Sequence, residues 1–116
     1  MGADKTCMET GSRRPVYSIL SDCSELEEGI HDFVVGLAEQ VDLLQDDEHG
    51  SDYEALEERA SLLAGQAERM GYPELSRATL KVVEACSEEL KDAVQKGLFE
   101  VTELARCIRM GHRGAA

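Results

Sequence analysis

The stretch that decides the fold is DYEALEERASLLAGQAERMG, residues 52–71. Its apolar residues recur at three- and four-residue spacing, at Leu56, Ala60, Leu63, Ala67 and Met70. This spacing places them on one face of an amphipathic helix. Gly71 is suited to end the helix, because glycine readily adopts the left-handed conformation found at helix C-termini. We therefore predict a helix whose apolar face packs on other helices.

Three more segments show the same periodicity. Pro73 suits the first turn of the segment that follows residues 52–71, and a break is expected near Ser87. The apolar residues of the three segments are Leu26, Ile30, Phe33, Val34, Leu37, Val41 and Leu44, then Leu75, Ala78, Thr79, Val82, Ala85 and Cys86, then Leu90, Val94, Leu98, Val101, Leu104, Ala105 and Ile108.

Two capping boxes predict where the first two helices begin. In each, Ser24 or Ser51 is followed three residues later by a glutamate, so that the two side chains can satisfy each other's backbone N–H groups. The first helix is expected to end near Gln45, because residues 46–50 form a polar, glycine-ended stretch that resembles a turn.

Four amphipathic helices with short connections indicate an all-α, antiparallel up-down-up-down four-helix bundle. No segment alternates at period two for long enough to predict a sheet. We expect a flexible N-terminal arm at 1–14, the bundle at 15–110 and a frayed tail at 111–116. Within the bundle, residues 15–20 form an apolar patch that could make one helical turn on its surface.

Composition restricts the class of protein. The 116 residues have room for one domain, and 42% apolar residues with only 4% aromatics suit a core of packed helices. The net charge of −12 would repel nucleic acid and anionic membrane surfaces. There is no bilayer-spanning run and no signal-peptide segment. The four cysteines form no CxxC pair and are expected to be reduced thiols of a cytoplasmic protein: Cys7, Cys23, Cys86 and Cys107.

Glu28 and His31 have the Glu-x-x-His spacing that occurs at the metal sites of di-iron helical bundles. Those bundles need a second such pair and two more helix glutamates, and the acid near His49 lies in the expected turn. We therefore predict surface histidines, no metal and no cofactor. No glycine-rich phosphate loop or Ser–His–Asp set is present either.

Residues 52–71 and the proline after them resemble the signature of histidine-phosphotransfer (Hpt) domains. In that family an aspartate-aromatic start leads into a helix carrying His-x-Leu-Lys-Gly-Ser/Ala-Ala, then an apolar-Gly stop and a proline. The resemblance extends over roughly residues 15–110. The positions in register are Leu63, Gly65, Ala67, Met70, Gly71 and Pro73.

The departures from the Hpt pattern concern its chemistry. Ser61 stands where the resemblance places the phosphate-accepting histidine. Ala64 replaces the lysine that helps to hold the phosphoryl group, and Val83 replaces the polar residue that orients the imidazole. A hydroxyl without an adjacent base is a poor nucleophile. The resemblance therefore implies a degenerate member that is not an enzyme and does not carry histidine phosphate.

A partner-docking face could survive this loss. Ser61, Leu62 and Gly65, flanked by Glu58 and Glu68, are expected opposite the apolar stripe. In Hpt domains the glycine leaves room for a receiver domain, although an incidental or inherited surface glycine fits the sequence equally well. The glutamates would weaken docking to the acidic phosphorylation pocket of a receiver.

The function predicted is that of a non-catalytic, Hpt-like interaction module in bacterial two-component or phosphorelay signalling. Its partner would be a response-regulator receiver or a histidine-kinase domain. The alternatives are a phosphotransfer intermediate that uses an unexpected residue, and a helical adaptor unrelated to phosphorelay.

Overall fold

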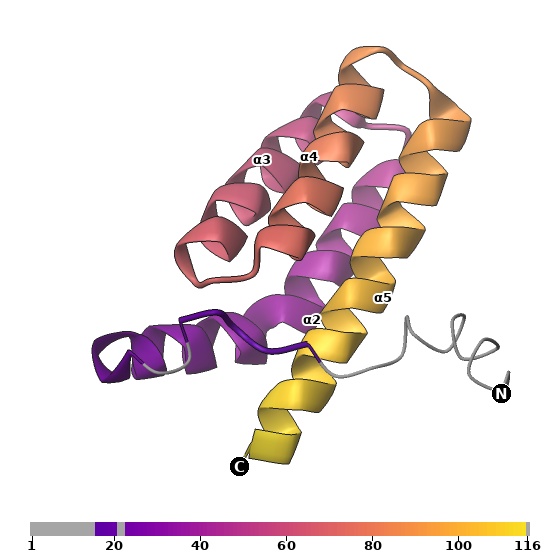
Figure 1. Ribbon diagram of the computed structural model, residues 1–116. Helices are drawn as coiled ribbons and strands as arrows, with labels where there is room; N and C mark the ends of the chain where they lie inside the picture. Colours follow the sequence, from indigo (N-terminus) through magenta and orange to yellow (C-terminus); the bar gives the residue numbers. More distant parts are fainter. Residues whose placement is uncertain (1–15, 21–22, 116) are drawn as a thin grey trace, which may run out of the picture.

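Four α-helices form the part of the chain that the computed structural model describes, residues 16–20 and 23–115 (Figure 1). They are α2 (Glu27–His49), α3 (Tyr53–Arg69), α4 (Pro73–Ser87) and α5 (Lys91–Ala115), with a short 3₁₀ turn, η1 (Ser24–Leu26), before α2. No strand occurs within these residues. The predicted all-helical class is therefore confirmed.

The helices are arranged around one core. α3 packs on α4, α4 on α5, α5 on α2 and α2 on α3, and successive helices run in opposite directions (Figure 1). The core is built from aliphatic side chains of all four helices, as the periodicity predicts. Leu37, Leu56, Leu75, Val82 and Ile108 are among the fully buried residues.

Some predicted core positions lie at the edge of the core or outside it. Leu26, Phe33, Met70 and Leu104 are only partly buried and pack against it. Leu90 is 49% exposed, because it belongs to the connection between α4 and α5 and not to a helix face.

Both predicted capping boxes were wrong. Neither η1 nor α2 has a side-chain cap, and Ser24 lies within the 3₁₀ turn. α3 is capped by Asp52, whose carboxylate accepts a hydrogen bond from the Ala55 backbone N–H at 3.2 Å. Ser51 has a left-handed backbone with φ of 56°, which turns the chain between α2 and α3. A carboxylate one residue further along therefore takes the role assigned to the serine.

Helix ends also differ from the prediction. α2 continues through the expected turn to His49, because the acidic residues 46–48 do not break a helix, and it ends just before Gly50, the only glycine of that turn. α5 includes residues 111–115, where a frayed tail was expected. α3 ends just before Gly71, whose φ of +86° agrees with its predicted role, and α4 begins at Pro73 and ends at Ser87 as predicted. The expected arm at 1–14 lies outside the described residues.

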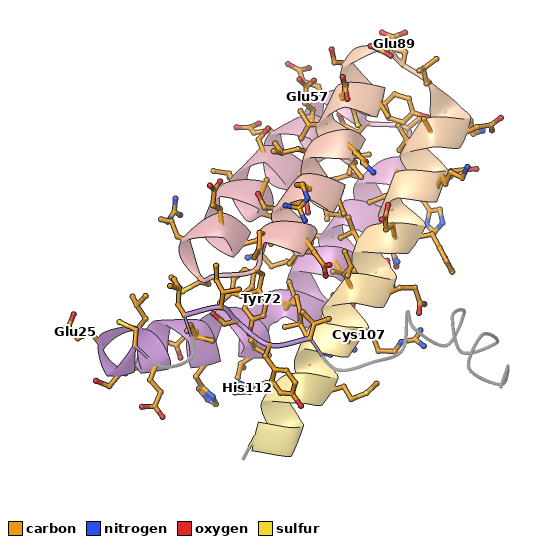
Figure 2. The ribbon with its side chains drawn as sticks, viewed as in Figure 1. Glu25, Glu57, Tyr72, Glu89, Cys107 and His112 are labelled. Carbon is orange, nitrogen blue, oxygen red and sulfur yellow. The ribbon has the colours of Figure 1, made fainter. Side chains whose placement is uncertain are left out.

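Residues 16–20 form a strap across the end of the bundle at which α3 joins α4, without making a helical turn. The Val16 N–H donates to the Cys107 carbonyl at 2.9 Å, and the Ile19 N–H donates to the Gly71 carbonyl at 2.8 Å. Two glycines make room for the strap. A Cβ at Gly71 would clash with the Ser18 hydroxyl, and a Cβ at Gly111 would lie only 2.6 Å from the Val16 carbonyl oxygen. Tyr72 and Cys107, labelled in Figure 2, lie beside this crossing.

Candidate functional site

The outer face of α3 carries the residues predicted to dock a partner. Ser61, Leu62, Glu58 and Glu68 are exposed, and Gly65 is partly exposed. The opposite face of the same helix is fully buried at Leu56, Ala60, Leu63 and Ala67. Leu62 is 64% exposed, so it places an apolar side chain on the outer face of a helix whose opposite face is buried.

Gly65 leaves open space on this face. A Cβ built there would meet only the Nη1 atom of Arg69, at 3.6 Å, an ordinary van der Waals contact. The guanidinium of Arg69 therefore lies next to the glycine, one helical turn away. Sequence reasoning missed this cation, although the four-residue spacing between Gly65 and Arg69 could have indicated it.

Of the two supporting positions, one lies in the interior of the bundle and the other at the edge of the core. Ala64 is only 3% exposed, and Val83 is partly buried and packs against the core. Neither side chain offers a polar atom to Ser61. Among the described residues, no side chain forms a hydrogen bond with the Ser61 hydroxyl. Within the described part of the chain, no side chain is therefore in place to act as the base that activates this serine.

The histidines lie elsewhere. His31 of α2 and His112 of α5 contact each other, with 2.9 Å between Nδ1 and Nε2. His49 is exposed at the other end of α2. No group of three or more His, Cys, Asp or Glu side chains in the described ranges is arranged to hold a metal ion. The Glu28 and His31 spacing is thus not completed into a carboxylate-rich metal centre.

Polar contacts fix α3 against α2. Arg59 forms an ion pair with Asp47 at 2.8 Å, and this hydrogen bond is the main cause that raises the pKa of the guanidinium. The Gln40 amide donates to the Gln66 side-chain oxygen at 3.3 Å. These contacts hold the orientation of α3 and therefore of its outer face.

Another exposed apolar side chain lies away from α3. Phe99 of α5 is 67% exposed, more than Leu62. It borders an open groove between α2 and α5 that is lined mainly by polar side chains, among them Gln45, Glu48, Thr102 and Glu103. This groove, with Phe99 at its edge, is another surface at which a partner could bind.

The thiol of Cys86 is buried in the core. Burial, with a smaller contribution from the charge of Glu57, raises the pKa of the Cys86 thiol to about 11. A thiol in that state is a poor nucleophile at neutral pH.

Comparisons with known proteins give no relative. No family model matches the chain, and neither the curated proteins nor the solved structures contain a match. Within the described residues, no helix has the length and apolar character needed to cross a bilayer.

Proposed function

We propose that this chain is an Hpt-like protein-interaction module of bacterial two-component signalling, and that it binds a receiver or kinase domain without carrying phosphate. It would work in the cytoplasm and not as an enzyme. The observation that carries the proposal is a patch on the outer face of α3 made by Ser61, Leu62 and Gly65. In this patch, exposed Ser61 and Leu62 lie beside the open space at Gly65. The arrangement of four packed helices supports the proposal, because an Hpt domain is a helical bundle (Figure 1).

The patch has the properties of a small docking site. Leu62 gives an apolar contact at its centre, and the missing side chain at Gly65 lets a partner backbone come close to the helix. Glu58 and Glu68 flank it, while Arg69 adds one cation. A partner surface without exposed carboxylates at the contact fits this charge pattern best.

The test is binding of the purified chain to a panel of receiver and histidine-kinase domains from the source organism. Gly65→Arg should abolish binding, because the bulky side chain fills the open space, while the melting temperature should not fall, because arginine has a higher helix propensity than glycine and the position is partly exposed. Gly36→Arg is the matched control: Gly36 is also a helical glycine, and a Cβ there would meet nothing within 4 Å. Equal affinity of wild type and Gly65→Arg would contradict the proposal.

Phosphotransfer is tested separately with a radiolabelled phospho-receiver. We expect no label on the wild type. Ser61→His should restore little transfer, because Ala64 and Val83 leave the imidazole without a nearby lysine or an orienting partner. Acid-labile label on the wild type would instead support a phosphotransfer intermediate that uses another residue.

The adaptor alternative is favoured by a specific observation, the exposed Phe99 in the groove between α2 and α5. If the chain binds through that surface, Phe99→Glu should abolish association and Gly65→Arg should not. The two variants therefore distinguish the two surfaces for any one partner.

A further inference from the structure

The imidazoles of His31 and His112 form a contact that the docking function does not use. They come from residues 81 positions apart, His31 near the start of α2 and His112 near the end of α5. Nδ1 of His31 and Nε2 of His112 are 2.9 Å apart, and the ring centroids are separated by 5.0 Å at an interplanar angle of 44°. Figure 2 labels His112 on the last part of α5, close to the first turns of α2.

From this geometry we propose that His31 and His112 form a two-histidine site for a divalent transition-metal ion, of which Ni²⁺ and Cu²⁺ fit best. Imidazole nitrogen is a preferred ligand of these ions. The protein supplies two ligands, and water completes the coordination. The bound ion would join the first turns of α2 to the last turns of α5.

The separation of the two nitrogens favours a particular coordination geometry. With metal–nitrogen bonds of about 2.05 Å, two nitrogens at right angles on one ion lie about 2.9 Å apart, whereas tetrahedral ligands lie about 3.3 Å apart. The 2.9 Å between Nδ1 of His31 and Nε2 of His112 is the separation of the hydrogen-bonded pair, and the two nitrogens can take adjacent positions on a square-planar or octahedral ion without moving apart. Cu²⁺ and Ni²⁺ commonly adopt square-planar or tetragonal arrangements with nitrogen and oxygen ligands.

A metal ion can replace the hydrogen that lies between the two facing ring nitrogens without any net loss of a proton. In the neutral pair, one of the two facing nitrogens carries the hydrogen that the other accepts. On metal binding, that ring moves its hydrogen to its outer nitrogen, so that both facing nitrogens are unprotonated and no net proton leaves. Small rotations of the two rings then direct both lone pairs at one ion. Acid would compete with the metal, because a protonated imidazole has no lone pair to give.

The surroundings of the pair include charges of both signs. On α2, Glu27 and Glu28 lie one turn before His31 and face solvent. On α5, Arg109 lies one turn before His112 and is partly buried. Asp32 directly follows His31, and Arg113 directly follows His112 in the sequence. Because the neighbouring charges are mixed, the imidazole nitrogens themselves must supply the affinity for the ion. Both histidines remain accessible, since His31 is exposed and His112 is half-buried.

The test is a titration of the full chain, without any histidine tag, with NiCl₂ or CuCl₂ at pH 8 in a buffer that does not chelate metals. We expect a saturable 1:1 binding event and a rise in melting temperature that follows the metal concentration, because an ion that binds only the folded state stabilises it. His31→Ala and His112→Ala should each weaken metal binding at least about tenfold. Mutation of a residue that only hydrogen-bonds to a metal ligand already lowers metal affinity about 10- to 100-fold, and these histidines would be the ligands themselves.

His49→Ala is the matched control. His49 is exposed on the same helix, 18 residues from His31 and so about 27 Å away along the helix axis. Its removal should leave affinity unchanged. In NMR spectra, Cu²⁺, which is paramagnetic in every coordination geometry, should broaden the ring signals of His31 and His112 before those of His49.

Two results would overturn the proposal. One is absence of saturable binding of either ion to the folded wild type. The other is affinity that remains the same in His31→Ala and His112→Ala, which would assign the ion to thiols, carboxylates or the chain terminus. Because the readout needs no signalling partner, failure here is distinguishable from failure of the docking proposal.

Discussion

Two glycines in different surroundings should respond to alanine with opposite signs. Gly65 lies within α3, and a Cβ there meets only Arg69 Nη1 at 3.6 Å. Gly65→Ala therefore gains the helix propensity of alanine, about 1 kcal/mol, without a steric cost. For a chain of this length, that gain raises the melting temperature by about 4 °C.

Gly97 lies within α5 at its closest approach to α4. It is buried, and a Cβ there would lie 2.9 Å from Cγ2 of Val82, which is fully buried and whose χ1 angle is stiff. Overpacking of this kind costs about 1–3 kcal/mol, which equals or exceeds the gain in propensity. Gly97→Ala should therefore leave stability unchanged or lower it by up to about 2 kcal/mol.

The assay is thermal and urea unfolding followed by circular dichroism, with both variants measured beside wild type. If Gly97→Ala stabilises the protein as much as Gly65→Ala, then α4 and α5 do not approach each other as described. If Gly65→Ala destabilises it, the outer face of α3 is not open. Either result would refute the reasoning.

Three further outcomes are expected. Leu63→Ala should lower the free energy of unfolding by about 2–5 kcal/mol in urea titrations, whereas Leu62→Ala should change it by less than about 0.5 kcal/mol, since Leu63 is fully buried and Leu62 is 64% exposed. Asp52→Ala should lower the free energy of unfolding by about 1 kcal/mol, because α3 loses its cap, whereas Ser51→Ala removes no cap and should not cause this loss. Thermal melts of the two variants measure the difference. Burial raises the pKa of the Cys86 thiol to about 11 from an ordinary value of 9.0. The stability that comes from keeping this thiol protonated should therefore be complete below pH 9 and be lost as the pH rises toward 11. Mass spectrometry of alkylated sites should find Cys86 unreactive at pH 8 in the native protein and reactive after unfolding.

Hydrophobic periodicity predicted the helices well because burial of an apolar stripe dominates their stability. Leu56, Leu63, Val82 and Val94 follow the predicted pattern and are fully buried. The helix ends were harder, because a cap depends on which of two neighbouring polar residues meets the free N–H groups. At α3 this was decided by the left-handed turn at Ser51, which local spacing does not reveal.

The candidate site was predictable only in part. Exposure of Ser61 and Leu62 follows from the helical period, and the structure agrees with it. Contacts between distant segments could not be predicted in the same way. The pairing of His31 with His112 and the strap over Gly71 depend on how whole helices pack. No local sequence signal contains that information.

The most direct test of the docking proposal is an NMR titration of the ¹⁵N-labelled chain with receiver and histidine-kinase domains from its own organism. The proposal predicts that at least one of them binds and that the largest shift changes cluster on α3 between Glu58 and Arg69, centred on Gly65. Absence of binding to every domain of both classes would contradict it. So would shift changes confined to the surface around Phe99.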